Sequence, residues 1–494
     1  MQTLRINRKD NVVVALTDIK KGEQVRVEEM IISVREDIKA GHKLALMDIE
    51  KGVEVVKYGF PIGQATTDIK RGEWVHIHNL HTGLADILEY TYEPAVYQKK
   101  KKETRDTFMG YRREDGKTGI RNEIWVIPTV SCVNRIAEII VRQASKELTF
   151  NNIEGIYEFK HPYGCSQVGD DHLATQKILA NLVKHPNAGG VLVLGLGCEN
   201  NQIKDMMKVL GDYNPKRVKF LVAQEVEDEI EVGVSLIKEL VEYASGFERQ
   251  QCPVSDLIIG HKCGGSDAFS GITANPLVGN LSDMLITQGG TAILTEVPEM
   301  FGAETILMNR AKTREIFLDI VKLINDFKSY YKENEQPVFE NPSPGNKEGG
   351  ITTLEEKSLG CIAKGGESIV EGVLGYTDIV NTRGLNLLNA PGNDMIASTA
   401  LAAAGCQIVL FTTGRGTPLG TCVPTVKIAT NSRLYEKKNS WMDFNAGSLL
   451  DGKSMESMVK DLKNYILSVS SGKLTRAEEL GFREIAIFKT GVTL

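Results

Sequence analysis

The stretch GGVLVLGLGCENNQ, residues 189–202, decides the fold class of this chain. Its apolar half is typical of a fully buried strand over 190–196, and its second half is a turn of glycine, cysteine and polar residues. Similar short apolar runs, separated by helix-length segments, occur at 123–130, 153–159, 218–223, 256–262, 291–297, 385–389, 407–412 and 484–488. We therefore expect parallel α/β sheets, which bind ligands in a crevice at the carboxyl ends of their strands.

The first 80 residues follow a different pattern. The motif Asp-Ile-x-x-Gly begins at Asp18, Asp37, Asp48 and Asp68, and each copy is followed within three residues by an apolar residue. Glycine allows the positive φ angle of a tight turn, and alternating segments such as 11–16 predict short strands between the turns. These features predict an all-β module over residues 1–92.

The segment YEPAVYQKKKKETR, residues 92–105, breaks both periodicities. We expect a flexible linker over 93–108, in which the four lysines are solvated, because no aromatic stacking platform accompanies them. The polar stretch FERQQCP, residues 247–253, is the expected boundary between two α/β domains. The resulting prediction is a multidomain chain with a middle domain over 109–250 and a C-terminal domain over 251–494.

Composition excludes several classes of function. The 58 basic and 64 acidic residues give a net charge of −6, which does not favour binding to nucleic acid or to an anionic membrane. No run of about 18 apolar residues occurs, and the N-terminus has no apolar signal-peptide core. Eight cysteines spread through a long chain are expected to be thiols. We expect a cytoplasmic protein that binds a small molecule.

Three cysteines follow predicted strands closely, namely Cys165, Cys198 and Cys263. If the strands are parallel, the three thiols lie at carboxyl edges and are candidate ligands, together with Glu199, for a soft metal such as iron. Three thiolates with an open position also suit an iron–sulfur cluster. The alternative is that each cysteine is a small buried hydrophobe, which we expect for Cys132, Cys252, Cys361, Cys406 and Cys422.

Polar residues crowd the same turns. Asn200 and Gln202 suit a polyhydroxylated or carboxylate ligand, although helix capping explains some residues of this kind. The carboxylates of Glu296 and Glu299 could bind a cation. Arg415 lies in a glycine-rich turn that lacks a Walker sequence, so it is either a carboxylate ligand or part of a surface turn. Lys347 lies in another polar, glycine-rich segment.

The β module also carries titratable groups. His76 and His78 share one face of a strand by the period of two, and Asn79 follows them. His42 follows a turn glycine, and Lys57 adds an ammonium group. Exposed imidazoles on a surface strand are the alternative to general acids, bases or metal ligands.

These motifs together resemble the altronate and galactarate dehydratase family over nearly the whole chain. The matching stretches include HPYGCSQVGDDH (161–172), KCGGSDAFSGITANP (262–276), NPSPGNKEGGITTLEEKSLG (341–360), TTGRGTPLGTCVPTVKIATNS (412–432) and FREIAIFKTGVTL (482–494). The resemblance implies an iron-requiring lyase with an N-terminal β-clip (SAF-like) module, a dimerising middle domain and a C-terminal Rossmann-like domain. The altronate branch matches better than the galactarate branch, particularly at the C-terminus.

The resemblance also implies a reaction: removal of water from D-altronate to give 2-dehydro-3-deoxy-D-gluconate in hexuronate catabolism. We expect Fe²⁺, replaceable by Mn²⁺, near the three cysteines, and a homodimer. Asn200, Gln202, Arg415, Lys347 and Asn79 would hold the sugar acid, and His42, His76, His78 and Lys57 would serve as acid, base or further ligands. The alternatives are a dehydratase of another sugar acid, such as galactarate, and a non-catalytic sugar-acid-binding protein.

Overall fold

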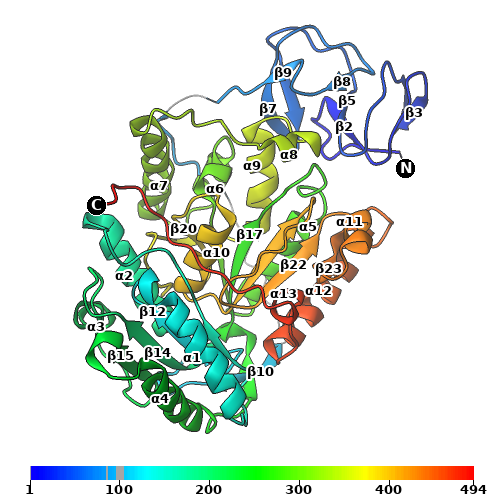
Figure 1. The fold of residues 1–494 in the computed structure, drawn as a ribbon. Coiled ribbons are helices and arrows are strands. Elements are labelled where there is room, and N and C mark those ends of the chain that lie inside the picture. The colour runs from blue at the N-terminus through cyan, green and yellow to red at the C-terminus, as the bar shows by residue number, and fades with distance from the viewer. Residues whose placement is uncertain (1, 85–86, 96–104) are drawn as a thin grey trace.

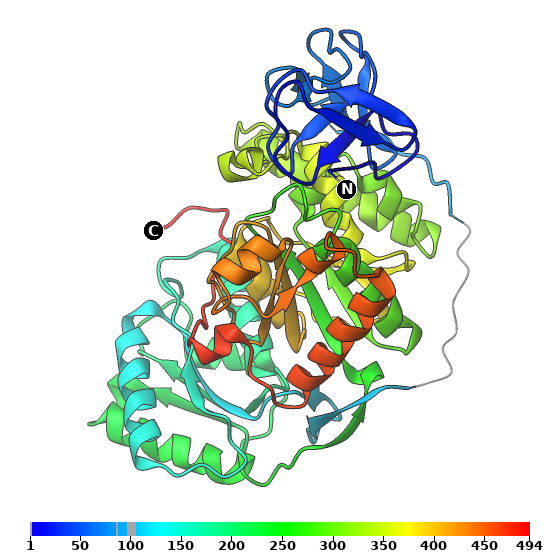
Figure 2. The ribbon, with the colours of Figure 1, turned by 90° about the vertical axis from the view of Figure 1, so that its right-hand side faces the viewer.

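A computed structural model describes residues 2–84, 87–95 and 105–494. Figures 1 and 2 show three parts stacked along one direction. A β module lies at one end, a sheet built from residues 123–222 lies at the other, and the C-terminal sheet lies between them. No helix in the described ranges is long and apolar enough to cross a membrane.

The first part of the chain is an all-β module, as predicted, and its strands pair antiparallel. Its strands are β1 (Thr3–Leu4), β2 (Val12–Ala15), β3 (Gln24–Val27), β4 (Met30–Ser33), β5 (Lys43–Ala45), β6 (Glu54–Lys57), β7 (Phe60–Ala65), β8 (Trp74–Val75) and β9 (Leu80–His81). The four repeat glycines have φ angles between 84° and 88°, which side chains other than glycine rarely adopt. The Asp-Ile-x-x-Gly repeat thus marks the turns.

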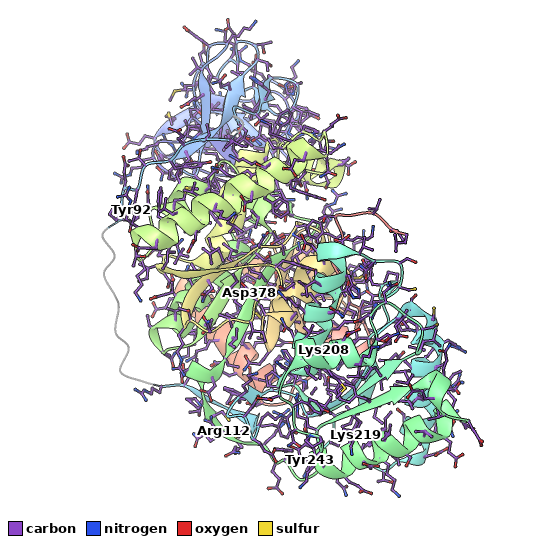
Figure 3. All side chains as sticks on the ribbon, turned by 90° about the vertical axis from the view of Figure 1, so that its left-hand side faces the viewer. Tyr92, Arg112, Lys208, Lys219, Tyr243 and Asp378 are labelled. Atoms are coloured by element: carbon purple, nitrogen blue, oxygen red, sulfur yellow. The ribbon has the colours of Figure 1, made fainter. Side chains whose placement is uncertain are left out.

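Residues 87–95 leave the β module and lie on the C-terminal domain. The Tyr90 hydroxyl donates to Glu304 Oε1 at 2.6 Å, and the Tyr92 hydroxyl donates to the Ala311 carbonyl at 2.7 Å. The Tyr92 ring also packs on Phe317 of helix α7 (Arg314–Glu333), and Figure 3 labels Tyr92. The four predicted linker lysines, Lys99–Lys102, lie outside the described residues.

The polar stretch at 247–253 forms a strand, which the sequence did not predict. Strand β16 (Gln250–Pro253) pairs antiparallel with β10 (Thr107–Arg112), which also pairs with β11 (Thr118–Gly119). The segments by which the chain enters and leaves the middle domain, β10 and β16, therefore lie side by side.

The middle sheet has the order β13-β12-β14-β15 and is parallel, as predicted. Its strands are β12 (Glu123–Pro128), β13 (Ile156–Glu158), β14 (Ala188–Gly195) and β15 (Val218–Val222). Helices α1 (Asn134–Glu147) and α4 (Glu229–Ala244) cover one face, while α2 (Gly169–Val183) and α3 (Ile203–Leu210) cover the other. The strand order reverses between β12 and β14, where a parallel sheet opens a crevice.

The C-terminal sheet is a second parallel sheet, with the order β19-β20-β18-β17-β21-β22-β23. Its strands are β17 (Ile258–Cys263), β18 (Thr291–Leu294), β19 (Val370–Leu374), β20 (Gly384–Leu388), β21 (Ile408–Thr413), β22 (Thr425–Ala429) and β23 (Phe444–Asn445). The strand order of this sheet reverses between β17 and β21, and we call such a place the switch point of a sheet. Cys263 is the last residue of β17, so it lies at this switch point.

Helices surround the C-terminal sheet (Figure 1). They are α5 (Ala274–Thr287), α6 (Glu304–Met308), α7, α8 (Pro344–Glu348), α9 (Leu354–Ile362), α10 (Asp394–Ala403), α11 (Ser432–Lys437), α12 (Met455–Ser470) and α13 (Arg476–Glu479). Apolar side chains of α5 and α12 belong to the same buried core as β17 and β18, while those of α10 face the middle domain's core.

The predicted last strand at 484–488 is wrong. Residues 482–494 form no helix or strand, because no neighbouring strand pairs with them, and two of the N–H groups at 484–488 bond to side chains instead. The Ala486 N–H donates to Thr399 Oγ1 at 3.0 Å, and the Phe488 N–H donates to the Tyr376 hydroxyl at 2.7 Å. This C-terminal tail crosses from the C-terminal sheet to the middle domain (Figure 1).

Candidate metal centre

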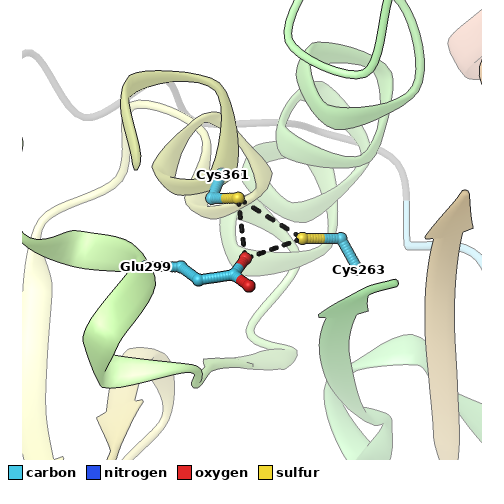
Figure 4. A group of neighbouring side chains, drawn as sticks. All are labelled: Cys263, Glu299 and Cys361. Atoms are coloured by element: carbon cyan, nitrogen blue, oxygen red, sulfur yellow. Dashed lines mark hydrogen bonds between the residues drawn. The ribbon is translucent and has the colours of Figure 1, made fainter. Parts of the chain in front are cut away.

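Two cysteines and one glutamate meet at the switch point of the C-terminal sheet (Figure 4). The Sγ atoms of Cys263 and Cys361 are 3.3 Å apart, and they lie 3.2 Å and 3.0 Å from Glu299 Oε2. The exposed fractions of the three residues are between 2% and 4%. We call Cys263, Glu299 and Cys361 the buried centre. Among the described residues it alone brings three such ligand atoms within 4.8 Å of one another.

The three side chains come from three separate elements. Cys263 is the last residue of β17, Glu299 lies in the 3-10 turn Val297–Met300, and Cys361 lies on α9. The turn begins after Glu296, whose φ of 71° and ψ of 58° place it in the left-handed region that non-glycine residues seldom occupy. Such strain persists only where surrounding contacts enforce it, and here Glu296 pairs with two buried lysines.

Lysines surround the carboxylates of this site. Lys262 and Lys364 both pair with Glu296, the latter at 2.6 Å. Lys357 Nζ lies 2.8 Å from Glu299 Oε1. Burial opposes ionisation of Glu299, but Lys357 and the other two lysines hold the pKa of that carboxyl well below its usual range. Glu299 is therefore a carboxylate at neutral pH.

The donor set fits a metal ion. The hydrogen bond with Cys263, together with burial, raises the pKa of the Cys361 thiol well above its usual value. A buried thiol that resists ionisation must lose its proton to bind a cation as a thiolate, and the cation favours that loss. Two thiolates and one carboxylate suit a borderline divalent ion such as Fe²⁺ or Zn²⁺ better than Mg²⁺ or Ca²⁺.

A cavity of about 1000 Å³ opens beside the buried centre. Its lining includes Cys263, Glu299 and Lys357 together with Lys347 and Asp394. Asp394 also pairs with Lys262 at 3.0 Å. The wall also includes aromatic side chains of α7, residues of the 340–346 segment and Phe488 of the C-terminal tail. The site therefore combines charged groups with an aromatic wall and suits a small anionic ligand.

The structure separates the four predicted metal ligands. Cys263 belongs to the buried centre, whereas Cys165 and Cys198 are exposed in loops of the middle sheet, so the expectation that the three thiols meet at one site is wrong. Glu199 is buried among its own loop. Its carboxylate accepts from Thr129 Oγ1 at 2.7 Å and from the Gly197 N–H at 2.6 Å, which fixes the turn after β14.

Of the predicted substrate-binding residues, Lys347 lines the cavity. Arg415 is half exposed and pairs with Glu348 at 3.0 Å. Asn200 and Gln202 lie in the middle domain, where Asn200 Oδ1 accepts from the Ser166 N–H at 2.9 Å. Asn79 holds a turn of the β module, since its side chain bonds to the backbone of His76 and Trp74.

The predicted catalytic residues lie in the β module and do not line the cavity. His42, His76 and Lys57 lie where the module contacts residues 348–356. His42 Nδ1 accepts from Trp74 Nε1 at 3.1 Å, so its Nε2–H donates to the Glu348 carbonyl at 3.2 Å. His76 Nδ1 lies 3.1 Å from Thr352 Oγ1, and burial lowers the pKa of His76 to about 3. His78 is exposed against the Trp74 ring. His76 is therefore neutral at pH 7 and has no proton to give as an imidazolium.

Lys57 belongs to a buried ion triad. Lys57 Nζ and Lys43 Nζ lie 2.7 Å and 2.8 Å from the two oxygens of Glu356, and all three side chains are at most 1% exposed. Burial opposes the charge on Lys57, but Glu356 raises its pKa, so it is held as an ammonium ion and is unsuited to act as a base. Because Glu356 lies on α9, this triad fastens the β module to the helix that carries Cys361.

Sequence reasoning missed Cys361 and the lysines around it. Cys361 lies mid-helix and follows no strand, so it was assigned to packing. A signal was available in LEEKSLGCIAKGG, residues 354–366, where four charged residues stand among small and apolar ones, and the side chains of all four are buried. Charged residues are seldom buried unless they are paired.

Comparisons with known proteins cover the whole chain. Residues 1–83 match the altronate/galactarate dehydratase SAF domain, residues 110–245 match the D-galactarate dehydratase/altronate hydrolase second domain, and residues 254–493 match the D-galactarate/altronate dehydratase C-terminal domain. An altronate dehydratase of Bacillus subtilis is 57% identical, over 99% of both chains. An altronate dehydratase of Escherichia coli is 51% identical over 100% of both chains, and a galactarate dehydratase (L-threo-forming) of the same organism is 33% identical over 98% of this chain and 96% of its own.

Proposed function

The chain belongs to the altronate and galactarate dehydratase family, and from this premise we propose that it removes water from D-altronate to give 2-dehydro-3-deoxy-D-gluconate. The observation that carries the proposal is full-length similarity to altronate dehydratases, which exceeds the similarity to a galactarate dehydratase. The charged cavity beside the buried centre supports it, because a sugar acid is small, polar and anionic.

Dehydration of a sugar acid requires three catalytic functions. A base removes the proton next to the carboxylate, positive charge stabilises the aci-carboxylate that develops, and an acid protonates the departing C3 hydroxyl. Positive charge is available at the cavity, because Lys357 lines it and Lys262 and Lys364 pair with Glu296 next to the buried centre.

We assign the iron expected from the family to Cys263, Cys361 and Glu299. A bound Fe²⁺ would supply Lewis acidity, which polarises an oxygen of the substrate. Lys347 binds the substrate carboxylate in this assignment, since it lines the cavity and is not one of the lysines paired at the buried centre. Asp394 takes the C2 proton in this assignment, because it is a cavity carboxylate outside the buried centre and pairs with Lys262 at 3.0 Å.

The β module acts as a positioning element in this proposal. His42 and Lys43 contact the 348–352 segment, which continues from Lys347 into α9. The module therefore fixes both the proposed carboxylate ligand and the helix that carries Cys361. His42 and His76 then influence the reaction through the 348–352 segment rather than by contact with substrate.

The remaining expectations complete the proposal. The β module has a β-clip topology, the C-terminal domain is Rossmann-like, and the domains span 1–92, 109–250 and 251–494 with a linker over 93–108. The protein is a cytoplasmic homodimer that uses Fe²⁺, with Mn²⁺ as a substitute.

A substrate panel tests the proposed reaction. Protein loaded anaerobically with Fe²⁺ is assayed with D-altronate, galactarate and other sugar acids, and the 2-keto-3-deoxy product is measured. We expect the highest kcat/KM with D-altronate. A higher value with galactarate would shift the substrate assignment, and saturable binding of D-altronate without turnover would contradict a catalytic role.

The assigned residues have matched tests. Lys347→Met is expected to raise KM for D-altronate more than it lowers kcat, because it removes a carboxylate ligand. Asp394→Asn is expected to lower kcat by at least about 10², the contribution typical of general base catalysis. Unchanged kinetics in both variants would contradict the assignments.

A further inference from the structure

A second group of cysteines lies at the switch point of the middle sheet. Cys132 follows β12, Cys165 follows β13 and Cys198 follows β14, and these three strands are neighbours in the sheet. They are the three exposed cysteines of the chain, whereas the other five are buried. We call Cys132, Cys165 and Cys198 the edge cysteines. Neither the buried centre nor the cavity includes them.

Hydrogen bonds hold the three loops together. The Ser131 N–H donates to the Tyr163 carbonyl at 2.9 Å, and the Asn201 N–H donates to the Gly164 carbonyl at 3.0 Å. The approach is so close that a Cβ added to Gly164 would lie 2.0 Å from the Thr129 carbonyl oxygen. Each edge cysteine is therefore within three residues of a backbone contact to a neighbouring loop.

Polar atoms without partners occur in these loops and in the first turns of the helices that follow them. The side-chain atoms Gln167 Nε2, Asn201 Oδ1, Asn134 Oδ1 and His172 Nδ1 are buried and lack a hydrogen-bond partner among the described residues. Gln167 and Asn201 are 3% and 0% exposed. An unsatisfied buried polar atom is costly, so its recurrence beside three thiols indicates a ligand that is part of the native site.

The spacing of the thiols does not fit a single metal ion held by all three. Their sulfur atoms are not all within 4.8 Å of one another. Two thiolates on one ion stand at most about 4.6 Å apart, twice a metal–sulfur bond of about 2.3 Å. In an iron–sulfur cluster each thiolate binds a different iron, so the thiolates stand further apart. Amide donors are at hand to bond sulfur, since Gln224 Nε2 already donates to Cys198 Sγ at 3.7 Å.

We propose that the edge cysteines hold an iron–sulfur cluster, with one iron that has no cysteine ligand. Each thiol releases its proton when its sulfur binds iron, and iron and inorganic sulfide come from the cell's cluster supply. The Gln167 amide donates to sulfur of the cluster. The C-terminal tail closes one side of the site, because the Leu494 N–H donates to the Ser166 carbonyl at 3.0 Å, next to Cys165.

Reconstitution of the full-length protein tests this site. The protein is incubated anaerobically with Fe²⁺, sulfide and a thiol reductant and is then desalted, and iron, acid-labile sulfide and visible absorption are measured per chain. We expect the wild type to retain labile sulfide and to gain sulfide-to-iron absorption. Cys132→Ser, Cys165→Ser and Cys198→Ser should each lose most of both.

A matched control separates this site from the buried centre. Cys263→Ser should keep the labile sulfide of the wild type even if it loses turnover. Retention of labile sulfide by all three edge variants, or iron without labile sulfide in the wild type, would overturn the proposal. The second result would leave iron at the buried centre only.

Alkylation supplies a readout that does not depend on sulfide analysis. Reconstitution should protect Cys132, Cys165 and Cys198 of the wild type from iodoacetamide, as measured by peptide mass spectrometry. Equal labelling of the three cysteines before and after reconstitution would also overturn the proposal.

Discussion

The two parallel sheets place cysteines at the same topological position, but they give these cysteines opposite surroundings. Cys263, at the switch point of the C-terminal sheet, is buried with Cys361, Glu299 and a set of lysines. The edge cysteines, at the switch point of the middle sheet, are exposed among amide side chains. The difference lies in what covers each edge. Helix α9 and the β module cover the first, whereas loops and the C-terminal tail border the second.

The comparison teaches that topology locates a site and burial decides its chemistry. A buried edge must pair every charge, so it accumulates lysine–carboxylate contacts that hold carboxylates ionised. An exposed edge has no such requirement, and its thiols are free to bind a larger cofactor.

The largest expected effect comes from breaking the ion triad of Lys43, Lys57 and Glu356, which fastens the β module over the buried edge of the C-terminal sheet. Glu356→Gln leaves Lys43 and Lys57 buried without a carboxylate, which should cost about 3–5 kcal/mol of unfolding free energy. Denaturant unfolding measures this loss, and alkylation should show Cys361 becoming accessible. Glu348→Gln is the matched control, because it removes an exposed pair with Arg415 and should cost at most about 1 kcal/mol. Equal effects of the two substitutions would contradict the triad's role.

Low pH should weaken the same triad and lower the unfolding free energy, because it protonates Glu356. Burial opposes ionisation of Glu356, but Lys43 and Lys57 hold its pKa at about 2, against 4.5 for an ordinary glutamate. Between these values the unfolded chain binds the extra proton, so stability falls as the pH falls from 4.5 to 2 and is fully present above 4.5. The loss is roughly 3 kcal/mol, since one pKa unit is worth about 1.4 kcal/mol. Unfolding free energy measured against pH should show a smaller slope in Glu356→Gln.

Removing one ligand of the buried centre should abolish most turnover. We expect Cys361→Ser and Glu299→Gln to lower kcat/KM for D-altronate by at least about 10², or about 2.7 kcal/mol of transition-state stabilisation. Cys406→Ala, a core position away from the cavity, serves as the control for loss of a buried thiol. Activity in Cys361→Ser equal to that of Cys406→Ala would break the distinction between ligand and packing cysteines.

The smallest expected effect is on the reactivity of wild-type thiols without reconstitution. Cys132, Cys165 and Cys198 should react with iodoacetamide before Cys263 and Cys361, because only the first three are exposed. Burial and the hydrogen bond with Cys263 also raise the pKa of Cys361, which lowers its thiolate fraction. Peptide mapping over time measures the order, and early labelling of Cys361 would contradict the burial of the centre.

Local patterns in the sequence predicted most of the fold. Apolar runs identified β12, β14 and β17, and the Asp-Ile-x-x-Gly repeat identified the turns of the β module. The error at 484–488 has a physical cause, since an apolar alternating segment forms a strand only if a neighbouring strand supplies partners. Here Thr399 and Tyr376 supply them instead.

The site was predicted less completely, because it depends on contacts between distant residues. Cys263 and Glu299 follow strands and were both noticed as candidate ligands. Cys361 is 98 residues from Cys263 and reaches it from a helix. The spacing of the histidines in the β module predicted a catalytic role for them. The buried contacts that fasten this module to α9 are instead the ion pairs of Glu356 with Lys43 and Lys57.

Anomalous diffraction at the iron edge, from crystals of the Fe²⁺-loaded protein, tests the central claim most directly. The account predicts an iron peak in contact with Cys263 Sγ, Cys361 Sγ and a carboxylate oxygen of Glu299, whether or not a second peak lies at the edge cysteines. An iron-loaded, active protein with no peak between Cys263, Cys361 and Glu299 would contradict it.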